Sequence, residues 1–123
     1  MDQGLNEREF VVLLSGDCRI RHYHNRTRSQ ILEFMVQLEI LSKGRWTPIV
    51  RYDTAHDHAH RDIFHGDGRV EEVPLSFGDY NSALTFAEMD IRSNWEQYRE
   101  RFLREEREHD RQGILRQKPN LKF

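Results

Sequence analysis

The chain has little cysteine, no long apolar run and almost no net charge, and each of these absences excludes a class of protein. Its single cysteine, Cys18, cannot form an internal disulfide, which is typical of proteins in a reducing compartment. No apolar stretch approaches the roughly 20 residues that a membrane-spanning helix needs, and the first ten residues lack the layout of a signal peptide. We therefore expect a cytoplasmic protein without a membrane partner.

A net charge of −2 argues against attraction of the whole surface to nucleic acid, although it leaves room for a local basic patch. Seven Phe, two Trp and four Tyr side chains supply enough apolar area for a core, so the chain is not expected to be disordered. Its 123 residues have room for one core. We expect a single domain over residues 1–112 and a flexible tail over residues 113–123.

The first part of the sequence has the pattern of an antiparallel sheet. In residues 30–42 every second residue from Leu32 onward is apolar, which predicts a strand with one buried face and one wet face. Pro48 cannot donate a ladder hydrogen bond, so the next strand should be bulged or lie at an edge there. The segment 9–14 could be a strand or an extended lead-in. The expected strands of a four- to five-stranded meander are drawn from residues 9–14, 18–24, 30–42, 46–52, 60–65 and 69–75.

From about residue 79 onward the apolar period changes to three and four, which predicts an amphipathic helix. Asp79 and Asn81 are both suitable N-caps, and Gly113 is expected to end the helix. The predicted fold is α+β, an antiparallel β-meander of four to five strands packed against one long C-terminal α-helix. The apolar positions of this helix are Leu84, Ala87, Ile91, Trp95, Tyr98 and Phe102.

Four of the seven histidines lie within residues 51–68. His56, His58 and His60 alternate, so in an extended strand they would share one face and could bind a transition metal. A solvated polar loop would have the same composition. We assign no metal and no cofactor to this segment and keep the metal site as an alternative.

The same segment could cleave RNA without a metal. That reaction needs one group that removes the proton of the 2′-hydroxyl, another that protonates the leaving oxygen, and a cation that stabilises the phosphorane. Such sites are defined by geometry rather than by spacing, so a strand end with Arg51 and Asp53 on one wet face explains the pattern as well. The expected catalytic residues are His56 and His60 as base and acid, Arg51 or Arg61 at the phosphate, and Tyr52 and Asp53 beside them.

A second basic stretch, residues 19–28, contains four arginines and no acid. Arginine suits bidentate phosphate contacts, and tyrosine can stack on an unpaired base. A solvated edge strand whose charges prevent aggregation would have the same composition. If this stretch lies beside the histidine segment, the two would form one electropositive site. The expected nucleic-acid-binding residues are Arg19, Arg21, Tyr23 and Arg26.

The stretch from Trp46 to Asp62 fits the pattern W-x-P-[IV]-V-R-Y-D-x-A-H-x3-H-R-D, which resembles a pattern shared by small prokaryotic proteins. Its segment Tyr52-Asp53-x-Ala55-His56, followed by further histidines, also resembles TumE-type proteins of toxin–antitoxin pairs, although that family's downstream histidine pair has no counterpart that aligns. The resemblance implies a small sheet-plus-helix protein that acts on RNA or is held by an antitoxin.

The sequence thus predicts an RNA-binding protein of toxin–antitoxin type that cleaves RNA without a metal, with RNA and either a cognate antitoxin or a second copy as partners. The alternative is a non-catalytic interaction or dimerisation module. That alternative predicts an apolar patch left open on the helix or at a sheet edge. The sequence leaves open whether the protein is an enzyme.

Overall fold

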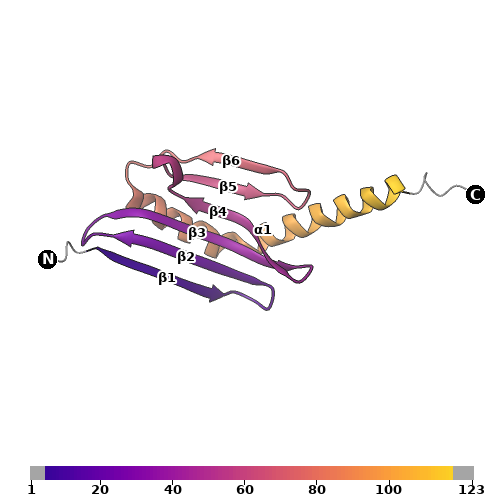
Figure 1. The fold of residues 1–123 in the computed structure, drawn as a ribbon, viewed down its shortest axis with the longest axis horizontal. Helices are drawn as coiled ribbons and strands as arrows, with labels where there is room; N and C mark the ends of the chain where they lie inside the picture. Colours follow the sequence, from indigo (N-terminus) through magenta and orange to yellow (C-terminus); the bar gives the residue numbers. More distant parts are fainter. Residues whose placement is uncertain (1–4, 118–123) are drawn as a thin grey trace, which may run out of the picture.

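A computed structural model describes residues 5–117 as six strands in one antiparallel sheet and one long helix (Figure 1). Each strand pairs with its neighbours in the sequence, so the sheet is a meander in the order β1-β2-β3-β4-β5-β6. The helix α1 lies against one face of the sheet, which we call the covered face, and we call the opposite face the open face. The elements are β1 Asn6–Leu13, β2 Cys18–Arg26, β3 Ile31–Ser42, β4 Arg45–Asp53, β5 His60–Phe64, β6 Val70–Pro74 and α1 Tyr80–Gln117.

The predicted fold class is confirmed, with six strands where four or five were expected. The N-terminal segment is a full strand rather than an extended lead-in. It pairs with β2 along its whole length, from Asn6 opposite Arg26 to Leu13 opposite Arg19. All six segments with strand character therefore join the sheet.

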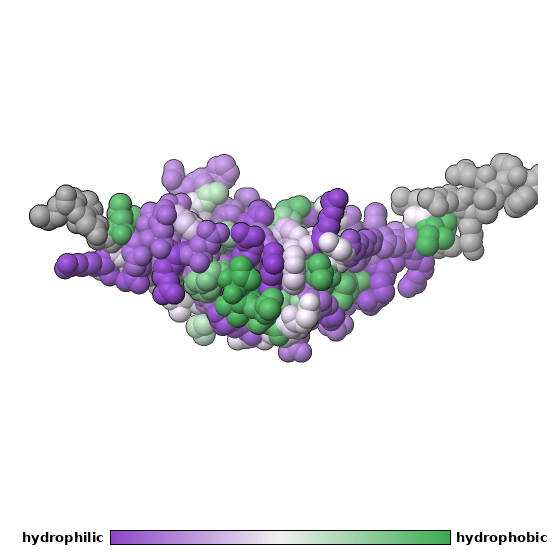
Figure 2. Space-filling view, turned by 60° about the horizontal axis from the view of Figure 1, so that its bottom comes forward, coloured by the Kyte–Doolittle hydropathy of each residue, from purple (hydrophilic) through white to green (hydrophobic). Residues whose placement is uncertain are grey.

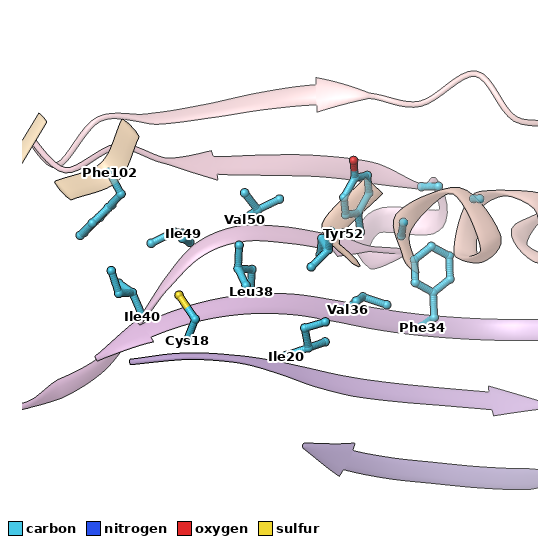
Figure 3. Packing of buried hydrophobic residues seen from close by; sticks show 14 residues of the cluster. Cys18, Ile20, Phe34, Val36, Leu38, Ile40, Ile49, Val50, Tyr52 and Phe102 are labelled. Carbon is cyan, nitrogen blue, oxygen red and sulfur yellow. The ribbon is translucent and has the colours of Figure 1, made fainter. Parts of the chain in front are cut away.

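The core lies between the central strands and the first half of α1. The alternate side chains of β3 from Phe34 to Ile40 are buried, and Tyr52 of β4 lies beside them (Figure 3). The helix meets these side chains with Ala83 and Ala87, whose small size allows a close approach. Removing this apolar area from water is the main favourable contribution to folding.

Pro48 interrupts the pairing of β4 with β3, as the sequence predicts. Leu38 pairs with Val50 but the next residue, Glu39, pairs with Pro48, so Ile49 is an extra residue in β4. An extra residue of this kind is a β-bulge, which locally breaks the alternation of faces. Consequently Ile49 and Val50 are both buried although they are adjacent.

The helix begins at one of the two predicted caps. Asp79 accepts a hydrogen bond from the Ser82 backbone N–H at 2.7 Å, and this bond holds the pKa of the Asp79 carboxyl below its usual value. Asn81 has a different partner, because its side chain accepts from the Ile31 N–H at 2.8 Å and donates to the Ser29 carbonyl at 3.0 Å. Asn81 therefore fixes the turn between β2 and β3.

The prediction that Gly113 ends the helix is wrong, because α1 continues to Gln117. Glycine costs a helix only about 1 kcal/mol relative to alanine. No proline lies between residues 80 and 117 to stop the helix. Of the expected tail, residues 113–117 are helical and residues 118–123 lie outside the described part of the chain. No helix within residues 5–117 is long and apolar enough to cross a membrane.

Three hairpin turns at one end of the sheet are tied to α1, which passes along the sheet and extends beyond these turns (Figure 1). Each turn contributes at least one polar side chain that pairs with a charged residue of the helix. The pairs are Asp17 with Arg99 at 2.7 Å, Ser42 with Glu106 at 2.9 Å and His65 with Glu105 at 2.8 Å. The helix is therefore held at the β1–β2, β3–β4 and β5–β6 turns as well as by the core.

Gly66, in the β5–β6 turn, packs directly on the helix backbone. A Cβ at this position would lie 2.2 Å from the Phe102 carbonyl oxygen and 2.5 Å from the Glu106 backbone nitrogen. Gly66→Ala should therefore lower the free energy of unfolding in urea by roughly 3 kcal/mol, because the turn must move off the helix. Gly113→Ala is the matched control, since no atom lies within 4 Å of its added Cβ and alanine favours a helix. Equal effects of the two substitutions would contradict the close approach.

Candidate functional site

The residues predicted to be catalytic do not share one face of the sheet. Alternate residues of a strand point to opposite faces, so Tyr52 faces α1 while Arg51 and Asp53 face away from it. In the β4–β5 pairing, Tyr52 lies opposite Arg61 and Asp53 lies opposite His60. Tyr52 and Arg61 therefore belong to the covered face, and Arg51, Asp53 and His60 to the open face.

His56 belongs to neither face. It lies in an exposed 3-10 turn, η1 (Ala55–Asp57), between β4 and β5, where His56 and Asp57 have φ angles of 63° and 64°. Non-glycine residues rarely adopt this left-handed region. Because the chain turns here, alternation does not align His56 with His58 and His60 as an extended strand would. The His58 and His60 rings are neighbours, with 5.1 Å between their centroids.

On the open face, two carboxylates converge on the His60 ring. Asp53 Oδ1 lies 2.9 Å from His60 Nε2, and Asp62 Oδ2 lies 3.7 Å from the same nitrogen. The other ring nitrogen, Nδ1, lies 3.3 Å from the His58 carbonyl oxygen. The His60 side chain is 4% exposed, whereas those of Asp53 and Asp62 are 17% and 15% exposed. Burial raises the pKa of the Asp62 carboxyl above its usual value.

Arg51 lies beside this cluster, opposite Asp62 in the β4–β5 pairing. Its Nε donates to Gln37 Oε1 at 2.6 Å, and its guanidinium stacks on the Phe64 ring at 5.0 Å from the centroid. The Gln37 amide donates in turn to Glu39 at 2.5 Å. Gln37 and Glu39 are both buried, so the prediction that this face of β3 is wet is wrong at its centre. The long side chains of neighbouring strands cover it.

Three of the four residues predicted to bind nucleic acid lie on the same open face. Arg19, Arg21 and Tyr23 alternate along β2 on the side away from α1. Arg19 donates to Glu39 at 2.6 Å and stacks on the Trp46 ring at 4.1 Å from its centroid. The basic strand and part of the histidine segment therefore share one surface.

The fourth residue, Arg26, has a local partner instead. Its guanidinium donates to the carbonyl oxygens of Thr27 at 3.1 Å and Arg28 at 2.8 Å, so it holds the turn after β2. On the open face, β3 lies between β2 and β4, so the backbones at Arg21 and Arg51 are two strand spacings apart, about 10 Å. The two stretches are near neighbours rather than a single contiguous basic site.

The covered face holds a second polar cluster around Asp90 of α1. Its Oδ2 accepts hydrogen bonds from the hydroxyls of Tyr52 and Tyr98, each at 2.5 Å, and its Oδ1 accepts from the Asn94 amide at 2.8 Å. Arg61 Nη1 lies 3.3 Å from the Tyr52 hydroxyl and 3.9 Å from Asp90 Oδ2. Burial raises the pKa of both tyrosines, that of Tyr98 to about 12. The hydroxyls and the carboxylate satisfy one another, so we interpret this cluster as a tie between helix and sheet.

A third polar cluster joins β2 to α1 and lies next to the edge strand β1. His22 Nδ1 bonds to the Glu88 carboxylate, and His22 Nε2 lies 2.7 Å from His24 Nδ1. The Phe10 ring of β1 stacks on His22 with 4.4 Å between centroids. The bond to His22 holds the pKa of Glu88 below its usual value, and burial lowers the pKa of His24. These two histidines therefore face the helix, away from the open face.

Sequence reasoning missed the helix partner of Tyr52 and one member of the open-face cluster. Asp90, Asn94 and Tyr98 recur at spacings of four, which places them on one helix face. Asp62 follows His60 by two residues, which places both on one face of a strand. Both spacings are visible in the sequence, but no nearby residue indicates which part of the fold each set of side chains contacts.

The model of the family described as Domain of unknown function (DUF7718) matches residues 5–108. The chain belongs to this family. No curated protein and no solved structure matches it. The DUF7718 match covers the whole sheet and α1 as far as Glu108, so it includes every residue of the three polar clusters. No named homologue supports the resemblance to TumE-type proteins.

Asp90→Asn tests whether the covered cluster of this DUF7718 protein is structural. The substitution keeps the shape but removes the charge that accepts two tyrosine hydrogen bonds and faces Arg61. We expect the free energy of unfolding, measured in urea, to fall by about 3 kcal/mol. The pKa of Tyr98 should also fall below about 12 in an alkaline absorbance titration, because the carboxylate no longer opposes the phenolate.

Asp110→Asn is the control for this experiment. Asp110 is an exposed residue of the same helix that pairs with Lys43 at the surface. Its substitution should change the free energy of unfolding by no more than about 0.5 kcal/mol. If both variants lost the same free energy of unfolding, the Asp90 cluster would not be a specific tie between helix and sheet.

Proposed function

We propose that the protein binds single-stranded RNA on the open face of its sheet. The observation that carries the proposal is the pairing of arginine with aromatic side chains across that face. Arg19 stacks on Trp46 at 4.1 Å and Arg51 stacks on Phe64 at 5.0 Å, while Tyr23 adds a further aromatic ring on β2. Proteins that bind single strands combine aromatic platforms for the bases with cations for the backbone.

Acidic neighbours limit the electrostatic contribution to this binding. Glu39 pairs with Arg19, and Asp62 lies opposite Arg51, so both arginines already have anionic neighbours. Arg21, whose side chain is 41% exposed, also has acidic neighbours, Glu9 at 3.5 Å and Glu39 at 4.0 Å. Stacking must therefore contribute more than charge. This favours unpaired bases over a duplex, where the bases are not available to side chains.

The geometry supports binding more than cleavage by a pair of histidines. His60 is buried and both of its ring nitrogens face oxygen atoms of the protein. His56 lies in a separate exposed turn. A base and an acid that act on one phosphodiester must both reach it, so we propose a binding protein.

A cognate antitoxin is the protein partner that we propose, on the strength of the resemblance of the segment Tyr52-Asp53-x-Ala55-His56 to TumE-type proteins. Asp53 of this segment lies on the open face beside the arginines. A protein that covers this face would compete directly with RNA. An antitoxin would then act by occlusion.

Tyr23→Ala tests the RNA-binding proposal. We expect the variant to bind a labelled single-stranded RNA at least about fivefold more weakly than the wild type, because stacking on one base contributes about 1–3 kcal/mol. Fluorescence anisotropy in the presence of EDTA measures the affinity. Contacts from three arginines predict a slope of about −2 in a plot of log K against log salt concentration.

Arg107→Ala is the control, since Arg107 is an exposed arginine of α1 outside the sheet. It should bind RNA as the wild type does. An unchanged affinity of the Tyr23 variant, or tighter binding of a duplex than of a single strand, would contradict the proposal.

A second function, self-association through β1, is favoured by one specific observation. β1 is an edge strand whose second half is apolar, and Val11 and Leu13 are 49% and 70% exposed. Apolar side chains gather on the side of the molecule bordered by β1 (Figure 2). The opposite edge strand, β6, carries two glutamates and Pro74, which oppose strand pairing. We propose a second copy of the chain as the partner of β1.

Leu13→Lys tests this interface, because a lysine on an edge strand opposes pairing with another strand. Sedimentation equilibrium should give about twice the chain mass of 14.9 kDa for the wild type and the monomer mass for the variant. Val70→Lys, an exposed valine on the other edge strand, should remain a dimer. A monomeric wild type, or a dimer that only the Val70 variant disrupts, would contradict the interface.

A further inference from the structure

Asp53, His60 and Asp62 place three ligand atoms around one point of the open face. Asp53 comes from β4, and His60 and Asp62 come from the paired strand β5, so the sheet fixes their separation. One carboxylate oxygen of each aspartate and one His60 ring nitrogen all lie within 4.8 Å of one another. No other set of three such ligand atoms within 4.8 Å of one another is found in residues 5–117.

The separations of these atoms suit a small divalent ion. Two ligand atoms that each lie about 2.0–2.1 Å from a zinc ion are about 2.9 Å apart at a right angle and about 3.4 Å apart at a tetrahedral angle. The distances from His60 Nε2 are 2.9 Å to Asp53 Oδ1 and 3.7 Å to Asp62 Oδ2. The first separation equals the right-angle value, and the second is slightly longer than the tetrahedral value.

Both ring nitrogens of His60 face an oxygen atom that can only accept a hydrogen bond. A neutral imidazole carries one N–H and one lone pair. Nδ1 faces the His58 carbonyl oxygen and Nε2 faces Asp53 Oδ1, and both of these oxygens can only accept. With the proton on Nδ1, the lone pair of Nε2 points at a carboxylate. A carbonyl that orients Nδ1 while Nε2 binds a metal is a common arrangement around metal-binding histidines.

Asp62 adds a partly buried carboxylate that has no hydrogen-bond donor among the described residues. Its side chain is 15% exposed, yet its carboxylate accepts no hydrogen bond from the described residues, and its nearest partner is His60 Nε2 at 3.7 Å. A cation at the point where Asp53, His60 and Asp62 converge would satisfy this carboxylate.

We propose that Asp53, His60 and Asp62 bind a divalent transition-metal ion such as Zn²⁺. An imidazole nitrogen in the set favours such an ion over Mg²⁺, and two carboxylates balance its charge. Three protein ligands leave at least one coordination position for water or for an oxygen of a ligand. The site uses His60 but neither His56 nor His58 as a ligand.

The neighbouring side chain indicates which ligand takes the open position, and this step rests on the proposed function. Arg51 lies opposite Asp62 on the same face. A metal ion beside a guanidinium is a suitable site for a phosphate oxygen of a bound RNA strand. Zn²⁺ bound by the three ligands should therefore also strengthen RNA binding.

Asp62→Asn is the variant that tests the metal site with the least damage to the fold, because Asp62 accepts no hydrogen bond from the described residues. In the absence of RNA, calorimetric titration should give one Zn²⁺ per wild-type chain and at least about tenfold weaker binding by the variant. Co²⁺ should produce a visible absorption band in the wild type that the variant lacks. Asp57→Asn, in the exposed turn nearby, is the matched control and should bind as the wild type does.

The outcomes separate this inference from the RNA proposal. The inference is overturned if the wild type binds no stoichiometric Zn²⁺ or if Asp62→Asn binds it equally well while its thermal melt is unchanged. RNA binding in EDTA tests the RNA proposal alone. If Zn²⁺ binds but does not raise the RNA affinity of the wild type above that of Asp62→Asn, the metal site stands and its role toward phosphate is excluded.

Discussion

The register of the β4–β5 pairing is the constraint on which both main polar clusters depend. It sets Tyr52 opposite Arg61 on the covered face and Asp53 opposite His60 on the open face. Because side chains alternate with a period of two, a slip of one residue would exchange the faces. Asp53 would then lie against the apolar core, where an unpaired carboxylate is costly. The hydrogen bond that the Tyr52 hydroxyl donates to Asp90 opposes such a slip, so the covered cluster also positions the open one.

The helix makes this register stable because it is held at both ends of the sheet. At one end Arg99 binds the β1–β2 turn at Asp17, and at the other Asn81 binds the backbone around the β2–β3 turn. Gly66 brings the β5–β6 turn within contact of the helix backbone. The open face therefore has a rigid support although no described element covers it. A rigid support is what a binding surface requires.

Most of the fold could be predicted from the sequence because its signals are local. The alternation in β3, the apolar stripe of α1, the Asp79 cap and the bulge at Pro48 each depend on residues close together in the chain. The end of the helix could not be predicted from Gly113 alone. The free energy that a single glycine costs the helix is smaller than the stabilisation that the surrounding helix-forming residues contribute.

The candidate site could be predicted only in part, because its geometry depends on long-range pairing. Alternation suggested that His56, His58 and His60 would align, but two residues with positive φ turn the chain between them. The burial of Glu39 depends on Arg19, which lies 20 positions away and reaches it across the sheet. The contact of Tyr52 with Asp90 spans 38 positions. Sequence spacing carries no information about such contacts.

The two main polar clusters lie on opposite sides of the same two strands, and the difference in their hydrogen bonding explains their different roles. Around Asp90, donors are plentiful: two hydroxyls, an amide and the Arg61 guanidinium meet one carboxylate. Around His60, acceptors are in excess, since two carboxylates and a carbonyl meet a single imidazole. A cluster whose acceptors are satisfied gains nothing from a further ligand and serves to hold the structure. A cluster with surplus acceptors is stabilised by binding a cation, and its position on the open face allows that cation to enter from solvent.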